Sequence, residues 1–491
     1  MKSSVTPVHR VFHSLLGLLL CGPLIAATPN IIVILADDVG WGDAGCYGGS
    51  KVKTPNIDRL ARSGVRFTDG HASASVCTPT RYSMLTGQYS WRRQVVGLNK
   101  GVATGDAPLL IPTAMTTAPG LLKAAGYQTA LIGKWHLGFG ENAPDYNREL
   151  RPGPLEVGFH EFFGIPATND RIPTVFVRDH RVVGLDPNDP IRVTYDKEQA
   201  RQQGLSMFAA GRNRIGWGSG GKAAWWKDID IADTHTKECL AFLERNRKKK
   251  FFLCFTPHDV HAPAIPHPRF VGSSGLGNRA DMLHELDWSI GEILQKLDEC
   301  GIAQDTLIIY SSDNGAYVME EGAHKPNGPF RGKKSQLWEG GHRVPFVVSW
   351  PGKIPPAVSE DLVSTIDIAA TICAAAEVKV AAQALPDSYN LLPAMMGDQK
   401  AGRRESLVVM SGNGQLALRS GAFKYIPDLS LADGWYAAAK KNGAGHKGAG
   451  LYDLTKDPGE ANNLATRDAA VVKRMARTLQ EIQDKDVTRP Q

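Results

Sequence analysis

Residues 77–81 read Cys-Thr-Pro-Thr-Arg, and residues 82–87 continue as Tyr-Ser-Met-Leu-Thr-Gly. A short run of small residues precedes Cys77, and Pro79 fits the first turn of a helix that begins here. Backbone N–H groups at such a helix start would stabilise negative charge on or beside the thiol, and Arg81 adds a permanent cation. The stretch therefore predicts a site for negative charge around Cys77, whereas a cysteine taken alone is more often a buried core residue.

Four apolar segments of the chain are typical of strands buried in a parallel sheet, and each ends in charged or polar side chains. These are residues 30–36 followed by Asp37 and Asp38, 129–132 followed by Lys134 and His136, 251–255 followed by His261, and 306–312 followed by Asp313 and Asn314. Each group alone could be a helix cap, a turn or a structural histidine. Because ligand sites in open α/β sheets lie beyond the carboxyl ends of the strands, we expect all four groups to lie on one rim near Cys77.

Four of these residues offer only hard oxygen ligands, namely Asp37, Asp38, Asp313 and Asn314. Such a set suits Ca²⁺ or Mg²⁺ and disfavours zinc, which prefers histidine and cysteine ligands. We therefore expect one divalent ion on the rim, where it would polarise a bound anion and stabilise charge on an attacking oxygen.

The motif Cys-x-Pro-x-Arg, followed here by Leu85-Thr86-Gly87, resembles the signature of the sulfatases, in which this cysteine is converted to formylglycine before folding. The resemblance spans nearly the whole mature chain and implies hydrolysis of sulfuric esters with Ca²⁺ or Mg²⁺ as cofactor. It also implies an α/β, alkaline-phosphatase-like sandwich: a large mixed, mostly parallel central sheet flanked by helices, plus a smaller C-terminal subdomain with an antiparallel sheet. The residues implied as catalytic are Cys77, Arg81, Lys134, His136, His261 and Lys334.

In the mechanism that the resemblance implies, one hydroxyl of a hydrated formylglycine at residue 77 attacks the sulfur atom of the substrate. His261, with Lys334 nearby, protonates the departing alcohol, and general-acid help of this kind is worth about 10²–10⁴ in rate. His136 then takes a proton from the second hydroxyl, so that sulfate leaves and the aldehyde returns. The chain departs from the usual family pattern at Thr80, where Ser or Ala is commoner. This departure bears on recognition by the formylglycine-generating maturation enzyme.

The chain divides into three predicted parts. Residues 1–27 have a basic start and an apolar run that ends in small residues, which predicts a cleaved signal peptide and hence a periplasmic or secreted protein. Residues 28–385 carry the catalytic motifs and form the expected sulfatase domain. Residues 386–491 predict four short strands and a terminal helix, and they form the expected C-terminal subdomain. The main helices are expected at 56–64, 119–126, 231–246, 280–300, 366–376 and 469–482.

The substrate is less well defined by the sequence. Residues 164–226 are rich in Gly, Pro, Asn and Arg, so we expect long loops over the active face that set specificity. Their cations and aromatic rings suit a sulfated sugar chain, although a solvated loop surface fits equally well. Similarity to exported sulfatases of the arylsulfatase and N-acetylgalactosamine-6-sulfatase type favours a sulfated polysaccharide or glycosaminoglycan fragment, or an aryl sulfate. The candidate substrate-binding residues are His258, His324, Arg178 and His180.

Composition argues against several other kinds of protein. The chain has 491 residues and a formal net charge of +6, and its longest basic block is residues 247–250, so nucleic acid is not an expected partner. No apolar stretch after the signal approaches the ~20 residues of a membrane span. Two alternatives remain open. One is a phosphodiesterase or phosphonate ester hydrolase on the same fold, which the segment 334–341 argues against. The other is a non-catalytic anion- or glycan-binding protein.

Overall fold

The computed structural model describes residue 1 and residues 28–48, 50–207, 214–398, 403–439 and 447–490. The expected signal peptide therefore lies, apart from residue 1, outside the described residues. Within the described part of the chain, no helix is both long and apolar enough to cross a bilayer.

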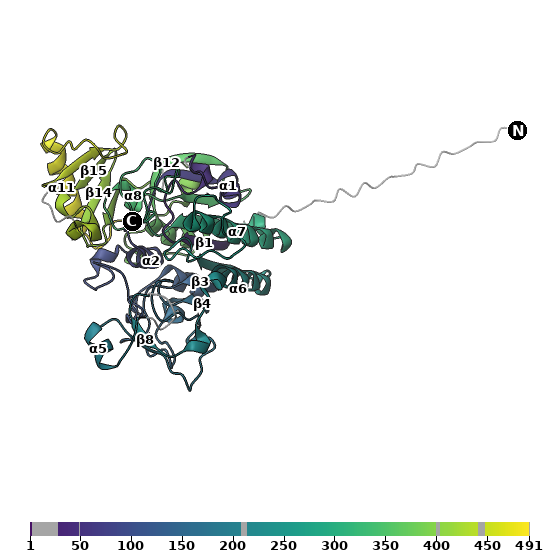
Figure 1. The fold of residues 1–491 in the computed structure, drawn as a ribbon. Helices are drawn as coiled ribbons and strands as arrows, with labels where there is room; N and C mark the ends of the chain where they lie inside the picture. Colours follow the sequence, from purple (N-terminus) through teal and green to yellow (C-terminus); the bar gives the residue numbers. More distant parts are fainter. Residues whose placement is uncertain (2–27, 49, 208–213, 399–402, 440–446, 491) are drawn as a thin grey trace.

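A ten-stranded sheet forms the centre of the molecule (Figure 1), with the strand order β12-β2-β11-β10-β1-β9-β3-β4-β5-β6. Its strands are β1 (Asn30–Ala36), β2 (Val65–His71), β3 (Gln128–Lys134), β4 (Glu161–Ile165), β5 (Val177–Arg178), β6 (Arg181–Val182), β9 (Phe251–Thr256), β10 (Thr306–Ser312), β11 (Phe346–Ser349) and β12 (Ala357–Ser364). The neighbours β10, β1, β9, β3 and β4 are all parallel, whereas β11 is antiparallel to both β10 and β2. The predicted mixed, mostly parallel sheet is thus confirmed.

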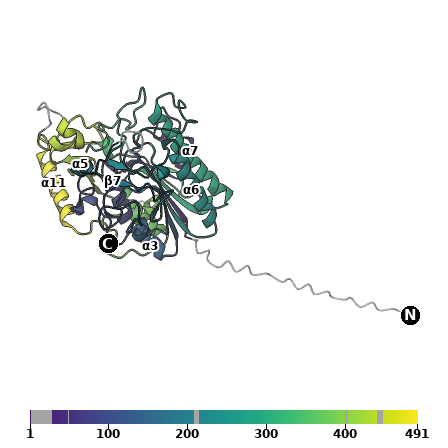
Figure 2. The same ribbon diagram turned by 60° about the horizontal axis from the view of Figure 1, so that its bottom comes forward.

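Side chains of β1 alternate between two hydrophobic cores, one on each face of the sheet. Ile32 and Ile34 belong to the core that the sheet shares with α1 (Pro55–Arg62), α6 (Ile231–Asn246) and α7 (Asn278–Glu299). Ile31, Val33 and Leu35 belong to the opposite core, shared with α2 (Cys77–Thr86), α3 (Ala118–Ala124) and α9 (Ile368–Ala375). Figure 2 shows α6 and α7 side by side along one face. The strand is apolar on both sides because helices cover both sides.

A second, antiparallel sheet follows towards the C-terminus. Its strands are β13 (Ser406–Met410), β14 (Leu416–Ser420), β15 (Phe423–Ile426) and β16 (Gly450–Asp453), in that order. The last helix, α11 (Ala469–Asp484), packs Met475 and Leu479 into the core of this sheet. Figure 1 shows the small sheet and α11 to one side of the main sheet, as the sequence predicts.

The expectation of long loops over residues 164–226 is wrong in part. A hairpin of β5 and β6 extends the main sheet beyond β4, and β7 (Arg192–Thr194) pairs with β8 (Trp217–Ser219) in a separate two-stranded sheet. The short helix α5 (Lys197–Gln202) lies between β7 and β8 in the sequence. These strands have only two or three residues, which is too short to leave a period-2 signal in the sequence. The remaining short helices are α4 (Pro154–Val157), α8 (Glu339–His342) and α10 (Leu392–Met395).

Candidate active site

The carboxyl ends of β1 and β10 bring four polar side chains together. The two strands pair in unbroken parallel register, so the residues that follow them are neighbours. The backbone N–H of Asp38 donates to Asp313 Oδ1 at 3.3 Å, and Asn314 Nδ2 donates to Asp38 Oδ1 at 2.7 Å. One ligand oxygen from each of Asp37, Asp38 and Asp313 lies within 4.8 Å of the other two, and all four side chains are buried. The oxygen-only set that the sequence suggested is assembled in one place.

Each of the three carboxylates faces a cation from another element. The pairs are Lys134 Nζ with Asp37 Oδ2 (2.6 Å), Lys334 Nζ with Asp38 Oδ1 (2.7 Å), and Arg81 Nε with Asp313 Oδ2 (2.9 Å). Burial raises the pKa of Asp38, but Lys334, His261 and Lys134 outweigh burial and hold that pKa well below its ordinary value. Burial and the neighbouring Asp37 together raise the pKa of Asp313 above its ordinary value. Burying these carboxylates without partners would be costly, and their pairing with Lys134, Lys334 and Arg81 offsets that cost.

Two acceptor atoms of this cluster lack a hydrogen-bond donor. Asp37 Oδ1 and Asn314 Oδ1 are buried and find no hydrogen-bond partner among the described residues. An orphaned buried acceptor is costly, so a group that binds in the native state is expected to satisfy it. Both atoms are hard oxygen donors, and the carboxylates beside them add negative charge. The donor set therefore fits a Ca²⁺ or Mg²⁺ ion.

The backbone at the ends of β1 and β3 turns sharply to aim side chains at the rim. Asp38 and His136 have left-handed φ values of 60° and 57°, a conformation that costs non-glycine residues of order 1–3 kcal/mol and clusters at functional sites. Gly133, at φ 121°, allows β3 to approach its neighbour, because a Cβ there would lie 2.0 Å from the carbonyl oxygen of Thr256. Gly133 is thus required by packing, and Lys134 and His136, which follow it closely in the sequence, form part of the rim.

Cys77 begins α2 directly beside this cluster. Its Sγ, an oxygen of Asp37 and a ring nitrogen of His261 all lie within 4.8 Å of one another. The residue is 2% exposed, and burial raises the pKa of the thiol even though Lys134 and Lys334 oppose it. The thiolate is the reactive form of cysteine, so this buried thiol is not activated as it stands. Cys77 lies next to the candidate metal ligands and His261, but its unmodified thiol is a poor nucleophile there.

His136 presents an acceptor nitrogen to the site. Its Nε2 lies 2.9 Å from the carbonyl oxygen of Ala103, so Nε2 carries the proton, and the buried Nδ1 has no partner among the described residues. Burial, followed by the charge of Lys134, lowers the pKa of His136 well below its ordinary value. Thr78 fixes the surroundings by donating to the His136 carbonyl oxygen at 3.1 Å and accepting from the Ala103 N–H at 3.0 Å. The ring is therefore a neutral, oriented base.

The His261 ring is held through Nδ1, whereas the His136 ring is held through Nε2. Its Nδ1 lies 2.6 Å from the carbonyl oxygen of Ala262 and 3.1 Å from Asn169 Oδ1, so Nδ1 carries the proton. The other nitrogen, Nε2, lies 3.8 Å from Asp38 Oδ2. Burial and the charge of Lys334 lower the pKa of His261 to about 4. Nε2 is thus the atom that can exchange a proton with a bound ligand.

Asn169 contacts the His261 ring, and the sequence pattern does not predict its place beside the rim. Besides the contact of its Oδ1 with the His261 ring, its Nδ2 donates to the carbonyl oxygens of His261 and Pro263 at 3.3 Å each. Arg214 holds the Asn169 carbonyl oxygen and forms an ion pair with Asp228 at 2.7 Å. Asn169 follows the end of β4, so the strand-end rule would have found it if the sequence had revealed that strand.

The four candidate substrate-binding residues have different surroundings. His258 is buried, and burial followed by the charges of His235, His261 and Lys134 lowers its pKa well below the ordinary value, which places it beside the rim. His324 Nε2 is 2.8 Å from Asp43 Oδ1, in a buried network with Arg279. On the β5–β6 hairpin and its turn, Arg178 pairs with Glu238, and His180 Nε2 lies 3.0 Å from a Glu156 oxygen.

The large, mostly parallel sheet with polar residues at its strand ends and a small antiparallel sheet beside it is the alkaline-phosphatase-like architecture of solved sulfatase structures. The family model described as sulfatase matches residues 29–378. The chain therefore belongs to the sulfatase family, and it is a sulfuric ester hydrolase.

Three relatives illustrate this membership. An N-acetylgalactosamine-6-O-sulfatase of Bacteroides thetaiotaomicron is 41% identical over 92% of this chain and 93% of its own. Human arylsulfatase A is 32% identical over 96% of this chain and 90% of its own. A solved structure from work on the metabolism of multiple glycosaminoglycans by Bacteroides thetaiotaomicron is 40% identical and superposes with a TM-score of 0.86. The match covers 94% of this chain and all of the other.

Proposed function

We propose that the protein is an exported sulfatase that removes O-sulfate groups from a carbohydrate, using a formylglycine made from Cys77 and a Ca²⁺ or Mg²⁺ ion. The observation that carries the proposal is the pairing of an unreactive buried thiol with orphaned hard oxygen acceptors at Asp37 and Asn314. The orphaned acceptors are costly in a merely structural site, and a bound ion would satisfy them. The thiol lies beside Asp37 and His261, where its conversion to formylglycine before folding would provide an oxygen nucleophile. Export is supported by the character of residues 1–27.

Added groups would supply two kinds of chemistry. A divalent ion held by Asp37, Asp38, Asp313 and Asn314 would neutralise the carboxylates and polarise the sulfate. Formylglycine, as its hydrate, would supply an oxygen nucleophile that the thiol does not.

The remaining steps belong to the side chains of the chain itself. With the carboxylates engaged by an ion, Arg81, Lys134 and Lys334 are free to clamp the sulfate oxygens, over which charge is spread. His261 is held through its Nδ1–H, so Nε2 is the atom that takes up a proton to form the imidazolium. The imidazolium passes that proton to the departing alcohol oxygen and returns to the neutral ring. His136 is held through Nε2, so its neutral Nδ1 is the atom that would accept a proton from the second hydroxyl at residue 77, the one that does not attack sulfur. The two histidines therefore act with opposite nitrogens and on different protons.

The carbohydrate substrate is supported by the relative named N-acetylgalactosamine-6-O-sulfatase, which matches over almost the full length of both chains. Two competing functions can be separated from the proposal by one assay. Purified protein would be given N-acetylgalactosamine 6-sulfate, 4-nitrophenyl sulfate and bis(4-nitrophenyl) phosphate, with the Cys77→Ala variant as control. We expect turnover of the sulfates that disappears in the variant. Faster turnover of the phosphodiester would favour a phosphodiesterase, and binding of the sulfated sugar without turnover would favour a binding protein.

A further inference from the structure

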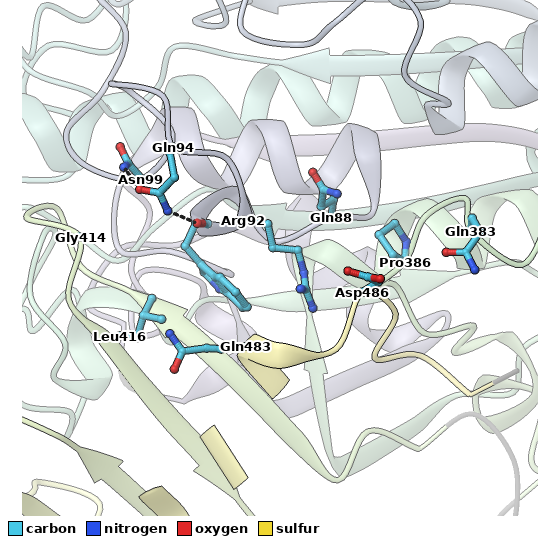
Figure 3. A pocket seen from close by; sticks show the side chains of 11 residues that line it. Gln88, Arg92, Gln94, Asn99, Gln383, Pro386, Gly414, Leu416, Gln483 and Asp486 are labelled. Atoms are coloured by element: carbon cyan, nitrogen blue, oxygen red, sulfur yellow. Dashed lines mark hydrogen bonds between the residues drawn. The ribbon is translucent and has the colours of Figure 1, made fainter. Parts of the chain in front are cut away.

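A polar pocket of about 740 Å³ lies apart from the catalytic rim, where the main sheet's helices meet the small sheet. Its walls come from four segments: the chain after α2, the chain after α9, the start of β14, and the end of α11 (Figure 3). Five of the lining side chains are carboxamides, namely Gln88, Gln94, Asn99, Gln383 and Gln483. These amides supply several hydrogen-bond donors and acceptors around one open space.

The pocket lining contains one cation, Arg92, and one carboxylate, Asp486, beside its amides. The carboxylate disfavours an anion and accepts hydrogen bonds from hydroxyl groups. The guanidinium of Arg92 is neutralised by both oxygens of Asp387, at 2.8 Å each. The amides of Gln383 and Gln483 make no hydrogen bond within the described residues, and both side chains are exposed. Each carboxamide both donates and accepts, which matches a hydroxyl or an acetamido group. The chemistry therefore fits a neutral, hydroxyl-rich ligand.

Trp91 provides a second observation at the same place. It lines the pocket and is only 9% exposed, yet its indole N–H has no hydrogen-bond partner in the described part of the chain. Its ring stacks on Tyr89, with centroids 5.2 Å apart, and the Arg92 guanidinium lies 4.7 Å from its centroid. Tyr89 and Arg92 thus pack against its ring. An unpaired buried N–H is costly, so a bound acceptor is the simplest way to satisfy it.

A short stretch of chain connects this pocket to the catalytic rim. Asn99 lines the pocket, and four residues later the carbonyl oxygen of Ala103 holds the His136 ring at 2.9 Å. Four residues span at most about 14 Å. On the other wall, Gly414 of the pocket is two residues from Gly412, whose N–H donates to the carbonyl oxygen of Ser335, next to the catalytic Lys334. These short connections place the pocket within the length of a short oligosaccharide from the rim.

We propose that this pocket is a subsite for an uncharged sugar residue of the same chain whose sulfated residue occupies the catalytic rim. The proposal rests on the proposed carbohydrate sulfatase function. It assigns affinity for longer substrates to Gln383, Gln483 and Trp91, none of which touches the catalytic residues described above.

The test uses the double variant Gln383→Leu/Gln483→Leu, which keeps the size of two exposed side chains and removes their amides. Gln480→Leu, on the same helix but outside the pocket lining, is the control. Direct binding of uncharged galactose and N-acetylhexosamine trisaccharides would be measured by calorimetry, together with kcat/KM for 4-nitrophenyl sulfate and for sulfated di-, tetra- and hexasaccharides. Thermal unfolding would verify that the variants are folded.

We expect the wild-type protein and the control to bind an uncharged trisaccharide and to favour longer sulfated substrates. The double variant should bind about tenfold more weakly and lose its preference for length, with the nitrophenyl substrate unaffected. Absence of trisaccharide binding to the wild type, or equal affinity in the double variant, would overturn the subsite. Trisaccharide binding without any turnover of sulfated sugars would instead refute the proposed function and leave the subsite standing.

Discussion

The protein contains two buried clusters of acidic and basic side chains. They differ in whether their acceptor oxygens already have a donor or a cation as partner. The first is the rim around Asp37, Asp38 and Asp313, where we propose that catalysis takes place. The second, here called the seam cluster, consists of Asp69, His71, Glu339, His342, Lys424 and Glu460. In each cluster three ligand-type side chains lie within 4.8 Å of one another, namely Asp37, Asp38 and Asp313 in the first and His71, Glu339 and His342 in the second.

The seam cluster already contains its own central cation. Lys424 Nζ, from β15, lies 3.2 Å from a Glu339 oxygen, 3.0 Å from His342 Nε2 and 2.9 Å from a Glu460 oxygen. The amine thus occupies the position that a metal ion would take, and it links the small sheet to the main domain. On the rim, Lys134 contacts Asp37 through its other oxygen, and Asp37 Oδ1 and Asn314 Oδ1 remain without donors among the described residues. Within the same residues, Glu460 Oε1 of the seam cluster also lacks a hydrogen bond, but the Lys424 amine lies 2.9 Å from it. The two clusters therefore differ in whether a cation lies at their centre and reaches the acceptor oxygens. We interpret the seam cluster, which has such a cation, as structural, and the rim as the site of the reaction.

The largest effect is expected from weakening the rim. Asp313→Asn keeps the shape of the side chain but removes one carboxylate of the proposed ion site, so turnover of a sulfate ester should fall about 10²–10³-fold or more. Metal content, measured by inductively coupled plasma mass spectrometry, should fall with it. Asp305→Asn, at the exposed opposite end of β10, is the matched control. Wild-type metal content together with wild-type turnover in Asp313→Asn would show that the rim is not the ion site.

Disrupting the seam cluster should lower the stability of the fold and leave sulfate ester hydrolysis by the folded protein unchanged. Lys424→Met leaves buried acids without their cation and should lower the free energy of unfolding by about 3–5 kcal/mol. Urea unfolding would measure this loss, and Lys456→Met, an exposed lysine near the same sheet, should change little. Metal content per folded molecule should stay the same. A folded Lys424→Met protein that had lost its metal would reverse the roles that we assign to the two clusters.

A smaller effect concerns pH. Burial raises the pKa of Glu460 to about 7, against the opposing charge of Lys424. In the folded protein this side chain therefore keeps a proton that the unfolded chain releases near its ordinary pKa of about 4.3. Its stabilising contribution is complete below that value and is lost as the pH rises through about 7.

Glu460→Gln should remove that dependence. Between pH 5 and pH 8 the wild-type protein should lose roughly 1–3 kcal/mol more unfolding free energy than the variant, as followed by urea titrations at each pH. Parallel curves for the two proteins would mean that Glu460 is ionised throughout.

The smallest effect is expected from Asn169, which supports the rim without entering it. Asn169→Ala removes an acceptor that orients the His261 ring, so kcat/KM for a sugar sulfate should fall about tenfold. The loss should be smaller for 4-nitrophenyl sulfate, whose leaving group needs little protonation. Asn188→Ala, exposed in the same segment, serves as the control. Equal losses on both substrates would indicate a general structural role for Asn169.

The sequence predicted the rim because its residues follow buried strands, and a parallel sheet gathers such strand ends at one edge. It could not predict the partners that come from elsewhere in the chain. Asn169 follows β4, whose sequence did not stand out as a strand, and Arg214 reaches it from a segment with no periodic pattern. The seam cluster was also not anticipated, because a lysine on a short strand of the small sheet has no local signal for deep burial. Burial of charge is a property of the packed domains and not of any one segment.

The central claim is that the rim is completed by chemistry at residue 77. Its most direct test is the mass of the peptide that contains this residue, measured in protein produced with and without a formylglycine-generating enzyme and compared with turnover of 4-nitrophenyl sulfate in each sample. We predict that active protein carries a carbonyl oxygen, or its hydrate, in place of the Cys77 sulfur. Turnover should scale with the modified fraction. Full turnover by protein whose Cys77 is an unmodified thiol would contradict the account.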